Sequence, residues 1–165
     1  MASIPFIKEM NPKNKSILFI LILIIMGLCA GIIFSTLSID RANQRIIEID
    51  PEAEIQPTLP FLGMTLITIN ISLLIGLLYT HISIFRKTKS RFLIGLILFL
   101  SALLIKSLFA YVSIQSLAIT TALENITSPI IETLDFSVTG FGGILILYHI
   151  FEFFVLSIFL YVSKE

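Results

Sequence analysis

Four apolar segments, each long enough to cross a lipid bilayer, fill most of this chain and limit what it can fold into. They lie near residues 16–38, 60–85, 92–117 and 138–162. A helix that spans the hydrocarbon core needs about 20 mostly apolar residues, and each segment meets that requirement. Hydrophobic residues make up 56% of the chain. We therefore predict an all-α integral membrane protein, a four-helix bundle that forms a single membrane domain of 165 residues.

Charge is distributed unevenly over the segments that join these helices. The short loop 86–91 is basic, whereas the segments 39–59 and 118–137 are acidic. The bases of the short loop are Arg86, Lys87, Lys89 and Arg91. Because Lys and Arg in short loops favour the cytoplasmic side of a membrane, we predict that loop 86–91 and both termini are cytoplasmic. The two acidic segments are then outer loops. The formal net charge is +0, which gives no indication of a nucleic-acid partner.

Small residues recur at helical spacing in the first two apolar segments. Gly27 and Gly31 form a G-x-x-x-G pattern, and Ser72 and Gly76 repeat the spacing. Such patterns let two helices approach closely, either within the bundle or at a dimer seam. The shortness of loop 86–91 predicts that the second and third helices form an antiparallel hairpin.

Polar residues of three apolar segments fall at a similar depth. They are Asn70, Lys106, His149 and Glu152. At a rise of 1.5 Å per residue from the cytoplasmic edge, Lys106 and His149 lie roughly 22 Å deep, Glu152 roughly 18 Å and Asn70 roughly 24 Å. His149 and Glu152 are three positions apart and face the same side of their helix. We predict an intramembrane polar cluster in which Lys106 pairs with Glu152 and the other two donate or accept hydrogen bonds.

Three interpretations of this polar cluster stay open at the level of sequence. It holds the third and fourth helices in register through polar contacts. Alternatively, Lys106 extends toward the outer face and keeps its amine in water. The third interpretation is a binding site for a ligand, a proton or an ion.

Residues for enzyme chemistry or for a cofactor are scarce. No Gly-rich phosphate loop, Ser/His/Asp set or H-E-x-x-H motif occurs. Cys29 is the only cysteine, so no intramolecular disulfide or cysteine-based metal site forms. A bis-histidine haem needs ligands at matching depth, but His81 is roughly 14 Å shallower than His149. We therefore expect no cofactor, no metal and no enzymatic activity.

The basic turn and its flanks resemble a group of small, uncharacterised archaeal multi-span membrane proteins. The resemblance rests on residues 77–91, where a helix ends in aromatic residues and turns through a basic loop, and on the closing span 134–162. It covers roughly residues 65–163. The first helix and the acidic loop after it are extra relative to that pattern. The resemblance implies an archaeal plasma membrane and no particular activity.

Two functions compete on these observations. The first is a non-enzymatic membrane component, either an accessory subunit or a small sensor-like module that works through helix contacts. Its partners would be membrane lipid and other membrane subunits or further copies of the chain. The second is a small proton- or ion-linked transporter whose route is lined by the polar cluster.

Overall fold

The computed structural model describes residues 12–48, 58–127 and 141–164, and four α-helices fill almost all of these ranges. They are α2 (Pro12–Ile47), α3 (Thr58–Thr88), α4 (Arg91–Thr127) and α5 (Phe141–Lys164). All four are long and apolar enough to cross a membrane. The predicted all-α architecture of membrane-spanning length is confirmed for these ranges.

Two helices extend beyond the apolar segments that predicted them. α2 continues to Ile47 and α4 to Thr127, so the two loops predicted to lie outside begin later than residues 39 and 118. Hydropathy marks where hydrocarbon ends, but a helix continues until Pro, Gly or a cap stops it. Neither extension contains Gly or Pro. The remaining loop residues 49–57 and 128–140 lie outside the described residues.

A two-residue turn joins α3 to α4. Lys89 has a left-handed backbone with φ of 51°, and its amide donates to the carbonyl of Phe85 at 2.8 Å, which closes the C-terminal turn of α3. Leu93 N then donates to Ser90 O at 3.2 Å and opens α4. The predicted antiparallel hairpin is therefore confirmed.

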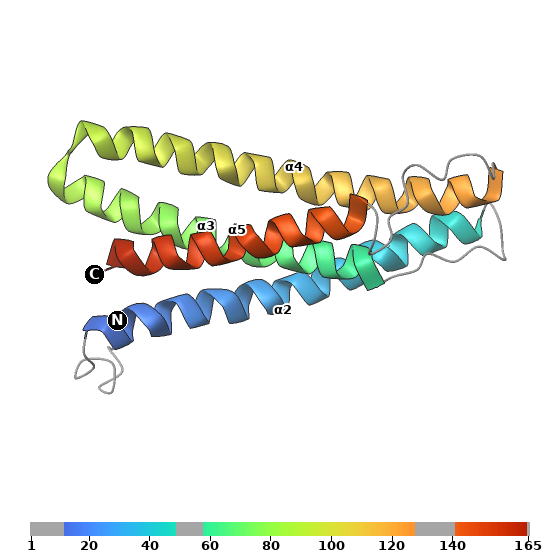
Figure 1. Cartoon of the computed structure of the whole chain (residues 1–165), viewed down its shortest axis with the longest axis horizontal. Helices are drawn as coiled ribbons and strands as arrows, with labels where there is room; N and C mark the ends of the chain where they lie inside the picture. Colours follow the sequence, from blue (N-terminus) through green and yellow to red (C-terminus); the bar gives the residue numbers. More distant parts are fainter. Residues whose placement is uncertain (1–11, 49–57, 128–140, 165) are drawn as a thin grey trace.

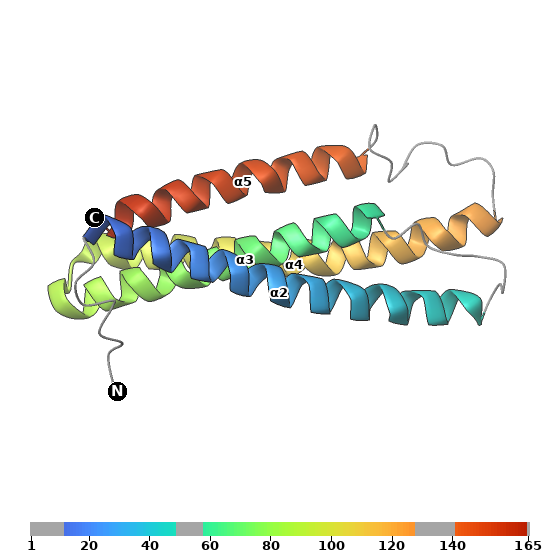
Figure 2. The same cartoon turned by 90° about the horizontal axis from the view of Figure 1, so that it is seen from below.

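α3 is the central helix of the bundle, and it packs against each of the other three (Figure 1). Over half of its apolar span (56%) is buried, against 11% for α2 and for α4 and 17% for α5. α4 and α5 share few close backbone contacts with each other. Figure 2 shows α2 crossing α3, with α5 on the other side of α3 over the half of the bundle away from the α3–α4 turn. The packing of the other helices against α3 therefore determines how they lie beside one another.

The apolar core surrounds α3 in two clusters. One contains Met64, Ile67 and Ile114. The other contains Ile69, Leu73, Leu74, Leu77, Leu100, Leu156 and Leu160. Asn70 lies on α3 between Ile67 of the first cluster and Leu73 of the second, and it is itself buried. The polar level of the bundle is thus enclosed above and below by apolar side chains.

The seam between α2 and α3 uses the predicted small residues. A Cβ atom added at Gly27 would lie 2.8 Å from Ile69 Cα, and one added at Gly31 would lie 3.1 Å from Thr65 Cα. Ser72 Oγ donates to Leu23 O at 2.8 Å across the same seam. The G-x-x-x-G pattern therefore serves packing within the bundle, the first of the two predicted alternatives.

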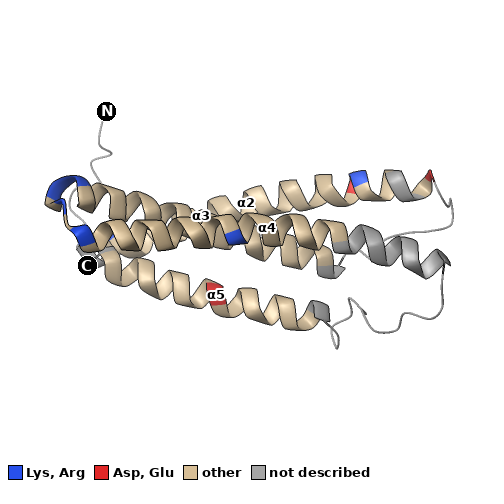
Figure 3. Cartoon of the chain, turned by 90° about the horizontal axis from the view of Figure 1, so that it is seen from above, with Lys and Arg blue, Asp and Glu red and all other residues tan. Residues whose placement is uncertain are grey.

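The charged residues of the described ranges separate along the bundle axis. Figure 3 shows Lys and Arg gathered at the end that holds the α3–α4 turn, while acidic residues of α2 lie near the other end. The start of α2 and the end of α5 share the basic end (Figure 1). Near the middle, one basic residue of α4 lies level with one acidic residue of α5 (Figure 3).

Candidate functional site

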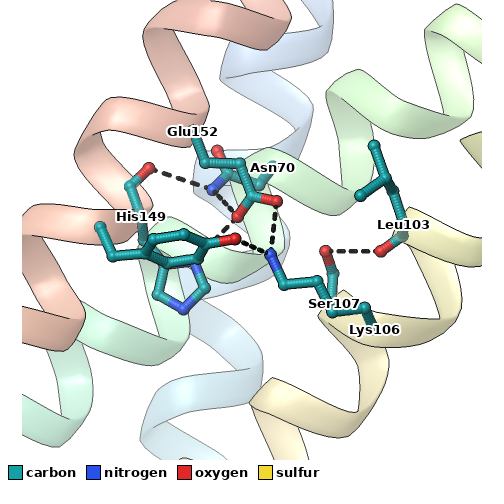
Figure 4. Close-up of polar contacts among 7 residues, drawn as sticks. Asn70, Leu103, Lys106, Ser107, His149 and Glu152 are labelled. Carbon is teal, nitrogen blue, oxygen red and sulfur yellow. Dashed lines mark hydrogen bonds and ion pairs between the residues drawn. The ribbon is translucent and has the colours of Figure 1, made fainter.

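Side chains from α3, α4 and α5 meet at the middle of the bundle (Figure 4). α3 contributes Asn70, α4 contributes Lys106, and α5 contributes His149 and Glu152. The structure therefore brings together the four residues that were grouped by depth. That they form a functional site stays a prediction. We call them, with Tyr148, the polar cluster from here on.

The carboxylate of Glu152 is the common acceptor of the polar cluster. Its Oε1 accepts a hydrogen bond from Lys106 Nζ at 2.9 Å. Its Oε2 receives Asn70 Nδ2 at 3.2 Å and lies 3.1 Å from His149 Nδ1. Since an ionised carboxylate only accepts, His149 Nδ1 carries the proton in this contact. Three donors from three helices thus converge on one acid, which is how a charge is held in a low-dielectric interior.

Asn70 also connects α3 to the backbone of α5. Its Nδ2 donates to the carbonyl of His149 at 3.1 Å, in addition to its contact with Glu152. Asn70 is 1% exposed, so both bonds are shielded from the surroundings of the bundle. The amide fixes the height of α5 against α3, which places the carboxylate at its observed level.

Tyr148 is a member of the cluster that sequence reasoning missed. Its hydroxyl accepts a hydrogen bond from Lys106 Nζ, and the same amine lies 4.4 Å from the centre of the ring. The available signal was its position one helical turn before Glu152, which places both side chains toward the same face.

Lys106 directs its amine to α5. The amine is bonded to Glu152 and Tyr148, so the interpretation in which it extends to the outer face for water does not fit the structure. The ion pair bridges α4 and α5, two helices with few close backbone contacts. The pair therefore holds α4 and α5 at a fixed level where packing alone does not.

Exposure differs sharply across the polar cluster. The side chains of His149 and Glu152 are 1% and 10% exposed, but that of Lys106 is 38% exposed. Tyr148 is 47% exposed. The anionic side is thus enclosed by the bundle, and the cationic side lies at its surface between α4 and α5.

One nitrogen of the polar cluster is buried without a bond. Within the part of the chain that the structure describes, His149 Nε2 has no hydrogen-bond partner, and neither has Asn70 Oδ1. Because Nδ1 donates to Glu152, a neutral His149 presents Nε2 as an acceptor.

The second histidine lies elsewhere on the α3–α5 seam. His81 Nδ1 is 2.8 Å from Leu77 O, and its ring packs against Phe159 with centroids 5.6 Å apart. Its side chain is buried rather than exposed at the membrane surface. Among the described residues no group of three or more His, Cys, Asp or Glu side chains is placed to hold a metal ion.

The described residues thus define a bundle of four helices of membrane-spanning length with a polar cluster near the middle of the bundle. The chain belongs to DUF8036, a family of unknown function, whose model matches residues 61–164. The match covers α4, α5 and all but the first turn of α3, and thus every residue of the polar cluster. No curated protein and no solved structure matches the chain.

Proposed function

We propose that this protein is a non-enzymatic membrane component that works by binding another membrane-spanning chain through its α4–α5 face. It acts as an accessory subunit or a small sensor-like module. The observation that carries the proposal is the surface position of the Lys106 amine in an ion pair at the middle of the bundle. No other charged pair among the described side chains bridges two helices at this depth.

The physical argument concerns charge in hydrocarbon. A charged side chain at the centre of a bilayer costs about 2.5–3.5 kcal/mol on insertion scales, and such residues almost always face a bundle interior or a water-filled cavity. Lys106 is 38% exposed and Tyr148 is 47% exposed in the single chain. A neighbouring helix over this face would convert the exposed ion pair into an interior one.

The proposed orientation follows from the position of the bases. Arg86, Lys87, Lys89 and Arg91 occupy the α3–α4 turn and its flanks. The positive-inside rule assigns this end, with both termini, to the cytoplasm. We place the protein in the plasma membrane, and an archaeal one on the resemblance of residues 77–91.

Native mass spectrometry of the full chain, extracted mildly from its own host membranes, tests this function. We expect a stoichiometric complex with another membrane chain or with a further copy. The double variant Lys106→Met/Glu152→Met removes the charges of the face and should release the partner. The control Cys29→Leu changes an exposed position of α2 and should retain it. A chain recovered only as a monomer would contradict the proposal.

A proton-linked carrier is the second candidate, because His149 Nε2 is buried without a partner next to the Glu152 carboxylate. Proteoliposome flux measurements under proton, sodium and potassium gradients separate the two. Flux that is lost in Glu152→Gln but kept in Glu48→Gln, an acid one residue after the end of α2, would favour the carrier. The absence of flux under every gradient would remove it.

A further inference from the structure

The polar cluster presents two hydrogen-bond donors on the surface between α4 and α5. The Lys106 amine has three N–H groups, and Glu152 and Tyr148 accept from two of them. The Tyr148 hydroxyl accepts from that amine at the surface, so its own O–H is left to donate elsewhere. Within the part of the chain that the structure describes, neither the third N–H nor this O–H has an acceptor.

Exposed apolar side chains flank this pair of donors on both helices. Phe109 follows Lys106 by one turn of α4, and Ile144 and Phe151 lie one turn to either side of Tyr148 on α5. All three are largely exposed. In helices of membrane-spanning length, a level near the middle of the bundle lies in hydrocarbon, where a donor without an acceptor costs free energy. Polar groups ringed by apolar side chains are typical of the centre of a protein interface.

The α4–α5 face presents a cation rather than a neutral ion pair. The side chain of Lys106 is 38% exposed, whereas that of its counter-ion Glu152 is 10% exposed. Inside the bundle, the same carboxylate also accepts from Asn70 and His149. A molecule that contacts this face therefore meets the amine and not the carboxylate. The complementary group is an anion.

We propose that the α4–α5 face binds a membrane-spanning helix of a different protein that carries an aspartate or a glutamate at the level of Lys106. The carboxylate has two oxygens, one to accept from the Lys106 amine and one to accept from the Tyr148 hydroxyl. Such charge-assisted bonds are stronger than those between neutral groups. An asparagine or glutamine amide offers a single acceptor oxygen and no charge to offset the cation, so it matches the two donors less well.

A second copy of this chain does not supply the carboxylate. Glu152 is enclosed and is already the acceptor of three donors. The other acids of the described ranges, Asp40, Glu48 and Glu124, lie toward the end of the bundle away from the basic turn. The acid must therefore come from another chain. This inference rests on the proposed function, in which the α4–α5 face contacts another membrane chain, and it adds the chemistry of that partner.

Synthetic polyleucine helices of bilayer length, with aspartate, asparagine or leucine as the central residue, test the inference. Energy transfer between the labelled full chain and the labelled helices in phosphatidylcholine vesicles measures binding. We expect the aspartate helix to bind roughly tenfold more tightly than the asparagine or the leucine helix. Moving the aspartate by seven residues, roughly 10 Å along the helix, should abolish this preference, because both donors lie at one level.

Variants of the chain distinguish this contact from general association of apolar helices. Tyr148→Phe keeps the ring and removes one donor, so the preference for the aspartate helix should fall several-fold. The matched control Tyr79→Phe removes the hydroxyl of an exposed tyrosine on α3 and should leave the preference unchanged. Neither change affects a buried side chain, so the comparison does not depend on folding. Lys106→Met/Glu152→Met replaces the ion pair by apolar side chains and should abolish the preference.

The outcomes separate this inference from the proposed function. An aspartate helix that binds no more tightly than the leucine or the asparagine helix would overturn the inference. A native complex made only of this chain, or a native partner without an acid at this level, would also overturn it. In both of these cases the proposed function stands, because the native complex exists. Only monomers on native extraction would overturn both, since no partner would then carry the carboxylate.

Discussion

The contact between α2 and α3 and the contact between α4 and α5 are made by different means. On the α2 side the backbones come so close that a single methyl group at Gly27 would overlap Ile69. By contrast, α4 and α5 have few close backbone contacts with each other, and they are bridged by the Lys106–Glu152 ion pair. The α2–α3 seam is held by close packing, and the α4–α5 seam is held by one ion pair.

This difference indicates which of the two seams has groups left to contact another molecule. A seam of interlocking backbones offers no free bonding capacity, because its small residues are already used. A seam bridged by an ion pair leaves exposed small residues and a half-exposed amine beside it. The α2–α3 seam is therefore closed by packing, and the α4–α5 face is where we propose that a partner binds.

The largest effect is expected at the charged seam. Glu152→Ala removes the acceptor of Lys106, Asn70 and His149 at once and leaves an unpaired cation, so we expect a loss of about 3 kcal/mol in the free energy of unfolding. Steric trapping in bicelles measures it. Lys106→Met/Glu152→Leu should recover most of that loss, since an apolar pair needs no counter-ion. A single variant as stable as the wild type would contradict the central role of the carboxylate.

The close seam should respond nearly as strongly to a smaller change. Gly27→Ala places a Cβ atom 2.8 Å from the Ile69 Cα, and such overpacking costs about 2 kcal/mol. The matched control Gly95→Ala meets open space and should change stability by less than about 0.5 kcal/mol. Thermal unfolding of both variants in one detergent compares them. Equal losses would show that the two faces do not differ in packing.

The sequence carried enough information for the helices and for the level of the cluster. Hydropathy reports directly on spans of bilayer length, and a charge in hydrocarbon needs a partner at its own depth. A constant rise per residue then places Lys106, Glu152, His149 and Asn70 at one level. These rules concern position along the helix axis, which follows directly from the residue number.

Lateral arrangement was not predictable in the same way. All four helices are apolar enough to face lipid, so hydropathy did not reveal that α3 is central. Tyr148 was missed because depth alone was used to judge it, whereas its contact with Lys106 depends on which helix lies beside α5. The apolar segment that predicted α4 ends at residue 117, whereas the helix ends at Thr127, because hydropathy marks the limit of the hydrocarbon and not the end of a helix.

A moderate effect is expected for the amide that links α3 to α5. Asn70→Ala removes the bonds to Glu152 and to the His149 carbonyl, which should cost about 1–2 kcal/mol because buried groups lose their donor. Hydrogen exchange should rise in α5 around His149 more than in α2. The control Thr68→Val removes a hydroxyl bonded only within α3. Equal exchange in the two variants would argue against a link that is specific to α5.

The smallest effect belongs to a single polar bond in the close seam. Ser72 Oγ donates to Leu23 O at 2.8 Å, and such bonds between membrane helices average about 0.6 kcal/mol. Ser72→Ala should therefore lower the free energy of unfolding by about that amount. Ser113→Ala, whose hydroxyl bonds only to Phe109 O of its own helix, serves as the control and should have almost no effect. If Ser72→Ala cost as much as Gly27→Ala, hydrogen bonding would rank with shape at this seam, and its contrast with the α4–α5 face would be one of degree only.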